Sequence, residues 1–249
     1  GYSLFMASSR HDHKMEKSIV QAMVERRVDG VIICSTPVST GQSRQLTSFG
    51  VPIVVVNNQS AEEYRYSIYH DDRDGSRHVT RHLLDLGHRD IAYLGNAAAG
   101  RSTQDRLNGY QHELRAAGIE VAPGFIHEAP GGKPEHGLAS VDHFLALSHR
   151  PTALVCYNDM LAMGVLQGLR TNRIRVPEDM SVTGFDNIFF SAFTDPPLTT
   201  FDQPKRFIGA EAARLVLGLL DTGDLDGTPS EIRMLKGRLL VRASTAAPG

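Results

Sequence analysis

Polar side chains that directly follow short apolar runs are the residues of this sequence best suited to bind a small molecule. Asp186 and Asn187 follow the apolar run 181–185, and Asn158 follows the run 153–156 after one tyrosine. Ligands of open α/β sheets bind beyond the carboxyl ends of the strands, so carboxylate and amide groups placed there can hydrogen bond a polar solute. Asp186 could instead cap a turn, and Asn158 could cap the helix that follows it. Both interpretations of each residue stay open at this point.

Arg106 offers a second kind of recognition chemistry. Its guanidinium is a rigid fork of N–H donors that fits paired hydroxyl groups or a carboxylate. Ser102 lies four residues earlier, so on a helix both side chains fall on one face and the serine hydroxyl adds a contact. A surface arginine on the first turn of a helix is the alternative interpretation. Ser102 is also predicted to begin that helix, because serine is a common N-cap residue.

Motifs of catalysis and of cofactor binding are missing where they would be expected. The sequence has no Walker-type glycine loop, no G-x-G-x-x-G after a predicted strand, no G-x-S-x-G elbow and no H-E-x-x-H. His78 and His82 are four residues apart, a spacing able to bind zinc, but no third ligand lies near them in the sequence. Asp71 and Asp72 fit a solvated turn with an N-cap. We therefore expect no enzyme activity, no metal and no cofactor.

Composition narrows the class of protein. The 249 residues, 41% of them hydrophobic, suffice for one large or two modest α/β domains. The formal net charge is −2 and no segment is dense in Lys or Arg, so the chain lacks the basic surface of a DNA-binding domain. Cys34 and Cys156 both lie in apolar runs, which is typical of a reduced, cytoplasmic protein without disulfides. No apolar run is long enough to span a membrane.

Apolar runs typical of strands alternate with amphipathic segments typical of helices, which predicts parallel sheets flanked by helices. Strands are predicted at residues 3–7, 30–34, 52–56, 91–95, 153–156 and 181–185, with short strands near the end of the chain. Helices are predicted at residues 14–27, 42–49, 75–86, 105–117, 135–147, 159–169 and 207–220. Gly87 and Gly118 are predicted to end helices, since glycine adopts the left-handed C-terminal cap most easily.

Six blocks, taken in order, resemble the LacI/GalR family of ligand-responsive transcription regulators. They are ERRVDGVII (25–33), HLLDLGHRDIAYLG (82–95), RLNGY (106–110), YNDMLAMGVL (157–166), VPEDMSVTGFDNIFFSAFTDPPLTTFDQ (176–203) and LVRAST (240–245). The resemblance implies two doubly wound parallel-sheet subdomains with a ligand crevice between them, as in periplasmic binding proteins of type I. One subdomain would hold residues 1–69 and 204–231, and the other residues 70–203 and 232–249.

The same resemblance assigns roles to single residues. Arg106, Asn158 and Asp186 match positions that contact the ligand, with Asp186 accepting from sugar hydroxyls. Gln203 matches a position at the crossover between the subdomains. Asn57 stands where many relatives carry an aspartate, and because an amide both donates and accepts, a simple copy of the family's sugar-binding scheme is in doubt.

Further expectations concern the pocket lining and the dimer. The glycine-containing loop 129–136 stands where some relatives supply an aromatic ring, so Phe189, Phe190 or Lys133 are further candidates for the pocket lining. Met163, Leu166 and Phe193 match a surface that builds a two-fold dimer in the family, although all three could be ordinary core residues.

The resemblance predicts a small-molecule effector (a sugar, a sugar phosphate or a nucleobase), a homodimer, and operator DNA bound only through a helix-turn-helix ahead of Gly1. A periplasmic solute-binding protein of a transporter shares this fold and is the main alternative. Family members also begin this domain with a strand and a helix ahead of Gly1, and that strand lies between those predicted at 3–7 and 30–34. Without it, we expect a gap, a rearranged first subdomain or a swapped strand.

Overall fold

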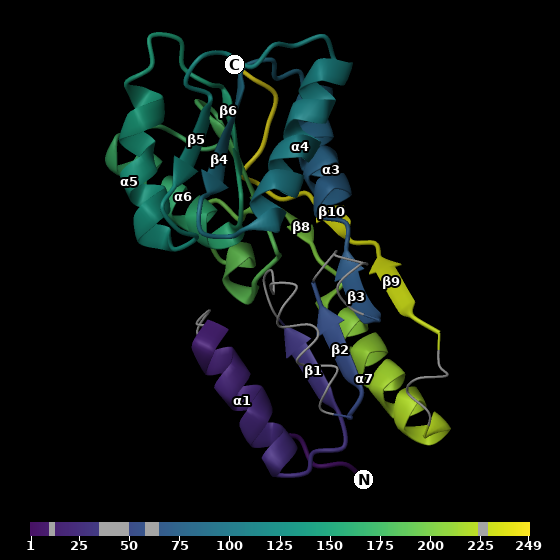
Figure 1. Cartoon of the computed structure of the whole chain (residues 1–249). Coiled ribbons are helices and arrows are strands. Elements are labelled where there is room, and N and C mark those ends of the chain that lie inside the picture. Colours follow the sequence, from purple (N-terminus) through teal and green to yellow (C-terminus); the bar gives the residue numbers. More distant parts are fainter. Residues whose placement is uncertain (10–12, 35–49, 58–64, 224–228) are drawn as a thin grey trace. The chain divides into compact units, whose positions relative to one another are not determined.

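A computed structural model describes residues 1–9, 13–34, 50–57, 65–223 and 229–249 of the chain (Figure 1). The chain divides into two compact units, the first made of Gly1–His70 and Pro204–Leu235 and the second of Asp71–Gln203 and Lys236–Gly249. Each unit is built on a mainly parallel sheet with helices, so the predicted α/β class is confirmed. Within the described ranges, no helix is both long enough and apolar enough to cross a membrane.

The first unit holds four parallel strands in the order β1-β2-β3-β9. Its elements are α1 (His13–Glu25), β1 (Val31–Cys34), β2 (Ile53–Val56), β3 (Tyr66–His70), α7 (Lys205–Thr222) and β9 (Glu231–Leu235). Helix α7 packs on this sheet through Ile208, Ala212 and Leu215, which are buried together with residues of β2 and β3. Strand β3 was not predicted, because its sequence YSIYH mixes polar with aromatic residues and shows no clean alternation.

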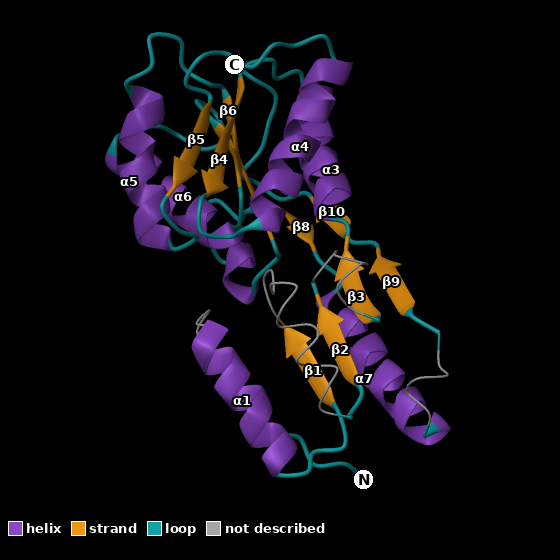
Figure 2. Ribbon diagram, in the orientation of Figure 1, coloured by secondary structure: helices purple, strands orange, loops and turns teal. Residues whose placement is uncertain are grey.

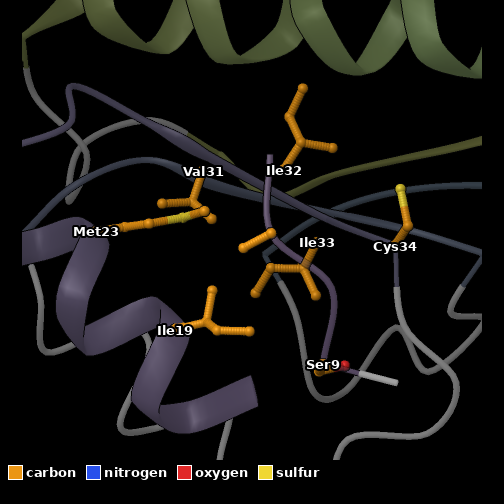
Figure 3. Close-up of a pocket in the computed structure, with 8 residues that line it drawn as sticks. Ser9, Ile19, Met23, Val31, Ile32, Ile33 and Cys34 are labelled. Carbon is orange, nitrogen blue, oxygen red and sulfur yellow. The ribbon is translucent and has the colours of Figure 1, made fainter. Parts of the chain in front are cut away.

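The predicted strand at residues 3–7 is wrong: this segment has no secondary structure and its large apolar side chains are exposed. A strand forms only where a neighbour pairs its backbone groups. Strand β1 pairs with β2, and no strand lies on its other side among the described residues. A small cavity of about 90 Å³ lies there instead, lined by Ile19 and Met23 of α1 and by Val31 and Ile33 of β1 (Figure 3). The helix predicted at 42–49 lies outside the described residues.

The second unit holds a six-stranded sheet in the order β10-β8-β7-β6-β4-β5, in which β10 alone runs antiparallel to its neighbour. Its strands are β4 (Ile91–Asn96), β5 (Ile126–Ala129), β6 (Ala153–Cys156), β7 (Ser181–Phe185), β8 (Thr199–Asp202) and β10 (Arg238–Leu240). Its helices are α3 (Asp72–Asp85), α4 (Arg101–Ala116), α5 (Pro134–Leu145), α6 (Asp159–Thr171) and the short 3₁₀ helix η1 (Phe189–Ala192).

Two pairs of helices cover the two faces of this sheet (Figure 2). Helices α5 and α6 bury Phe144 and Leu161 in one core, and α3 and α4 bury Leu83 and Tyr110 in the other. Helices α3 and α4 approach each other at Gly109, where a Cβ atom would overlap the carbonyl oxygen of Arg73. Close helix packing therefore fixes the position of α4, the helix that carries Ser102 and Arg106.

Most predicted elements of the second unit are confirmed. The strands predicted at 153–156 and 181–185 coincide with β6 and β7, and the helices agree within a few residues at each end. Gly87 and Gly118 follow their helices with φ of 102° and 69°, as predicted for left-handed caps. Strands β5 and β8 were missed because the first is a short edge strand, IHEA, and the second follows two prolines.

Candidate ligand-binding site

The carboxyl ends of four parallel strands meet at one edge of the sheet in the second unit. Asn96 ends β4, Asn158 follows β6, Asp186 follows β7 and Gln203 follows β8. Arg106, from helix α4, contacts the same edge through Asp186 and through Tyr157, the residue before Asn158. The structure therefore brings together five of the predicted site residues, all of them within one compact unit: Ser102, Arg106, Asn158, Asp186 and Gln203.

Arg106 is the centre of this group, which we call the Arg106 cluster, and only 5% of its surface is exposed. Its Nε donates to Asp72 Oδ1 over 2.6 Å, its Nη1 donates to the carbonyl oxygen of Tyr157 over 2.5 Å, and its Nη2 lies 3.5 Å from Asp186 Oδ1. The guanidinium carbon lies 3.8 Å from the ring centre of Phe185 and 4.3 Å from that of Tyr157, within the range of cation–π contacts. The interpretation of Arg106 as a surface arginine is therefore wrong.

The charge of Arg106 is maintained by its neighbours. Burial by itself lowers the pKa of the guanidinium, because desolvation disfavours the charged form. The negative charges of Asp72 and Asp186 outweigh this effect and leave the pKa of Arg106 above its ordinary value. The side chain is therefore a cation at neutral pH.

Asp186 and Gln203 form the second part of the cluster. Gln203 Nε2 donates to Asp186 Oδ1, the same oxygen that lies near Arg106. The backbone of Asp186 has a φ of 110°, a region that side-chain-bearing residues rarely occupy, and residues in such strained conformations cluster at functional sites. Its backbone N–H donates to the carbonyl oxygen of Phe201 over 2.9 Å, which holds this conformation against β8. The loop after β7 thus places the Asp186 carboxylate beside the guanidinium.

Ser102 joins the cluster through Tyr157. The Oγ atom of Ser102 lies 2.7 Å from Tyr157 Oη and donates to the carbonyl oxygen of Ala99 over 3.1 Å. Burial raises the pKa of Tyr157, so its phenol stays protonated and able to donate. The prediction that Ser102 begins the helix is wrong: α4 begins at Arg101 after Gly100, whose φ of 63° makes the turn.

Asn158 uses its amide both for the fold and toward the site. Its Oδ1 accepts from the backbone N–H of Leu161 over 2.8 Å, so the N-cap interpretation is correct, while its Nδ2 donates to the carbonyl oxygen of Gly132 over 3.2 Å. A Cβ at Gly132 would lie 2.8 Å from Asn96 Nδ2 and 2.9 Å from Asn158 Nδ2. A side chain at this position would crowd both amides, which gives a physical reason for the glycine in a loop where some relatives carry an aromatic residue.

Asp72 is a site residue that the sequence did not reveal. We predicted a solvated turn there, but only Asp71 fits that prediction: it caps α3 by accepting from the backbone N–H of Asp74 over 2.9 Å. Asp72 is 7% exposed and is the direct partner of Arg106. Acidic residues are common on exposed first turns of helices, so its type and position alone gave no sign of burial.

Asp159 was missed for the same reason. It is completely buried on the first turn of α6. Its carboxylate accepts from Thr200 Oγ1 over 2.5 Å and from the backbone N–H of Ile188 over 2.8 Å. These bonds tie the loop that carries Asp186 to α6 and β8, so Asp159 positions the loop.

The remaining predicted residues lie elsewhere. Asn57 belongs to the first unit, where it follows β2 with a φ of 61° and is exposed; its contact with a ligand stays a prediction. Phe189 and Phe190 are exposed on η1, where the Phe189 ring centre lies 5.5 Å from that of Phe190 and 5.0 Å from that of Phe193. Lys133 is exposed 3.9 Å from a carboxylate oxygen of Glu135.

The predicted dimer surface needs one correction. Phe193 is exposed and Met163 is half-buried, but Leu166 is 6% exposed and packs in the core of the second unit. Leu166 therefore does not belong to an exposed apolar strip, because its side chain is buried in a core cluster. An exposed cluster of three aromatic rings is instead formed by residues 189, 190 and 193.

The two histidines with zinc-binding spacing make separate contacts. His82 Nε2 lies 3.0 Å from Thr245 Oγ1 and His78 Nδ1 lies 2.9 Å from the carbonyl oxygen of Asp74, so each histidine of the predicted pair has its own contact. In the part of the chain that the structure describes, no group of three or more His, Cys, Asp or Glu could hold a metal ion. A groove of about 430 Å³ at the end of α6 is lined by other residues, among them Arg170 and Arg173.

Comparison with known proteins identifies the family. Residues 80–245 match the periplasmic binding protein-like domain. The HTH-type transcriptional repressor PurR of Mannheimia succiniciproducens is 33% identical over 87% of this chain, which spans 65% of that protein's length. Among solved structures, transcription regulator GntR from Chromobacterium violaceum is 30% identical with a TM-score of 0.86, over 98% of this chain and 88% of that one. A sugar-binding transcriptional regulator of the LacI family from Escherichia coli, complexed with phosphate, is 27% identical with a TM-score of 0.84, over 98% and 86%. The chain therefore belongs to the periplasmic binding protein-like domain family, among the effector-binding domains of LacI/GalR type.

Proposed function

We propose that this chain is the effector-binding and dimerising core of a LacI/GalR-type transcriptional repressor that senses a sugar or a sugar derivative. The Arg106 cluster carries this proposal, because it gathers charged and amide groups at the sheet edge where ligands of α/β proteins bind. The names of the relatives support it: the protein from E. coli is a sugar-binding regulator, and PurR is an HTH-type repressor. The relatives reported above are regulators, so a transporter's solute-binding protein is not the favoured alternative.

The chemistry of the cluster suits a polyol. A sugar hydroxyl both donates and accepts, and the cluster supplies a carboxylate acceptor in Asp186, a cationic donor in Arg106 and side-chain amides in Asn158 and Gln203. We propose binding without catalysis. The Ser102 hydroxyl contacts Tyr157 Oη and a backbone carbonyl, neither of which would activate it as a nucleophile.

We further propose how binding is converted into regulation. A ligand that binds two conformations of the protein with different free energies shifts their populations, whereas equal affinity would shift nothing. Operator DNA would be bound through a helix-turn-helix outside these 249 residues, as the name of the PurR relative suggests. Such a regulator works as a homodimer in the cytoplasm, and two free cysteines suit that reducing compartment.

A ligand screen tests the proposal directly. Neutral monosaccharides and disaccharides, sugar phosphates and nucleobases would be added to the purified chain while its melting temperature is measured. We expect one class to stabilise it in proportion to the logarithm of ligand concentration, by about 2.7 kcal/mol at a hundred times Kd. Calorimetry of that ligand with Asp186→Asn should show affinity lower by on the order of tenfold, the loss of one charged hydrogen bond.

The matched control for that variant is Asp90→Asn. Asp90 precedes β4, and so lies at the opposite end of that strand from Asn96, where its carboxylate contacts the exposed His149. This variant should bind the ligand as the wild type does. The proposal fails if no member of the library stabilises the chain, or if both variants weaken binding equally.

A further inference from the structure

Asp72 occupies the part of Arg106 that an anionic ligand would need. Anions such as carboxylates and phosphates bind arginine best through two parallel N–H bonds of the guanidinium fork. Here Nε already donates to Asp72 Oδ1 over 2.6 Å, and Nη1 donates to the carbonyl oxygen of Tyr157 over 2.5 Å. An incoming anion would have to displace the Asp72 carboxylate before it could take the Nε edge of the fork.

The charges of the cluster act in the same direction. Asp72 and Asp186 each place a carboxylate beside the guanidinium: Asp72 Oδ1 lies 2.6 Å from Arg106 Nε, and Asp186 Oδ1 lies 3.5 Å from Arg106 Nη2. Arg106 and Asp72 are both buried, where solvent and salt screen charges poorly. An approaching phosphate therefore meets two carboxylates beside the guanidinium, whereas a neutral hydroxyl can accept from the arginine and donate to a carboxylate.

We propose that Asp72 is a specificity-determining residue of this site, which holds Arg106 and makes the site select neutral ligands over anionic ones. The proposal rests on the function proposed above and narrows its ligand to neutral sugars or other neutral polar molecules, excluding their phosphate esters. Asp72 acts through Arg106, so it is a positioning residue for the ligand and not itself a required contact. A purely structural role of Asp72 would change stability but would not create affinity for anions.

Inorganic phosphate is the probe for this proposal, because it needs no knowledge of the natural ligand. Phosphate would be titrated into the wild type and into Asp72→Asn at constant ionic strength, with calorimetry as the readout. Asparagine keeps the shape and one acceptor oxygen but removes the charge. The wild type should bind phosphate only weakly, and Asp72→Asn should bind it at least about tenfold more tightly, the effect of one hydrogen bond to a charged group.

Two further variants decide where the phosphate binds. Asp72→Asn combined with Arg106→Gln should lose the gained affinity, because the guanidinium is then absent. Asp74→Asn is the matched control: it removes a charge from the same helix, but Asp74 pairs with Arg77 at 3.6 Å and contacts the exposed His78. It should leave phosphate binding as weak as in the wild type. Asp72→Ser provides a second test of Asp72 if the asparagine variant does not fold.

Three results would overturn the proposal. The first is saturable binding of phosphate to the wild type in competition with a neutral ligand. The second is an equal phosphate affinity of the wild type and of the folded Asp72 variants. The third is a gain in phosphate affinity in Asp74→Asn as large as that in Asp72→Asn. Each of them leaves the proposed function standing, which falls only if the ligand screen fails.

Discussion

At the scale of single residues, the ion pair between Arg106 and Asp72 dominates the site. The partners come from α4 and α3, and both side chains are buried. A buried pair need not stabilise a protein relative to apolar residues, but removing one partner leaves an uncompensated charge in the interior. The same contact that shapes the ligand site therefore also makes this part of the second unit sensitive to substitution.

Arg106→Ala should destabilise the second unit by about 3–5 kcal/mol, because it removes one member of a buried ion pair. Urea unfolding of the variant and the wild type gives this difference. Arg101→Ala is the control, since its ion pair with Asp105 is exposed and 3.4 Å long, and should change stability by about 0–1 kcal/mol. Equal, small effects of the two substitutions would show that Arg106 is not held as described.

At the scale of elements, two histidines connect the end of the chain to α3 and to the segment that follows it. His88 Nε2 donates to the carbonyl oxygen of Ala246 over 2.8 Å, and its Nδ1 lies 2.9 Å from Thr152 Oγ1. His82 Nε2 lies 3.0 Å from Thr245 Oγ1. Burial lowers the pKa of both histidines. The hydrogen bond to Ala246 raises the pKa of His88, and the charge of Asp85 raises that of His82, but both effects are smaller than the effect of burial. The terminal segment is therefore held by neutral rings.

This contact predicts a loss of stability in acid. The pKa of His88 is lower in the folded chain than its ordinary value of 6.5, so below about pH 6.5 the unfolded chain binds more protons and stability falls. The slope reaches at most about 1.4 kcal/mol per pH unit for one such group. Urea midpoints between pH 8 and 5 should fall less steeply in His88→Asn, while the exposed His78→Asn should follow the wild type. A parallel decline in His88→Asn would refute this account.

At the scale of the whole molecule, the three rings of Phe189, Phe190 and Phe193 form an exposed aromatic patch on the second unit. Large exposed apolar groups cost free energy in water, and clustered ones commonly mark an interface. The patch supports the proposed homodimer, and it replaces the strip that we had expected to include Leu166.

Phe193→Glu should weaken dimerisation by at least about tenfold, because it places a charge in an apolar contact. Truncation of a central aromatic residue of an interface already has an effect of about that size. Sedimentation at several concentrations measures the change. Val241→Glu, at another exposed apolar position of the second unit, should leave the association unchanged. A wild type that stays monomeric at high concentration would remove the patch as a dimer interface.

The sequence by itself determined the class of fold and many of its elements. Strand and helix periodicity is a local property, so the bounds of β6 and β7 were predicted without error. The glycines that end helices and the N-cap Asn158 were likewise recognised from the residues next to them in the sequence. The position of polar residues after strands also indicated the edge of the sheet at which Asp186 and Asn158 lie.

Only the tertiary structure decided what those residues do together. Asp72 and Arg106 are 34 residues apart, and their pairing depends on how α3 packs against α4 at Gly109. The sequence could not show that Leu166 is core while Phe193 is exposed, because an apolar residue fits either place until the packing partners are known. The segment 3–7 is the opposite case: it has the residues of a strand but lacks a neighbouring strand to pair with in the described structure. Burial and pairing are properties of which segments meet, and no local pattern contains them.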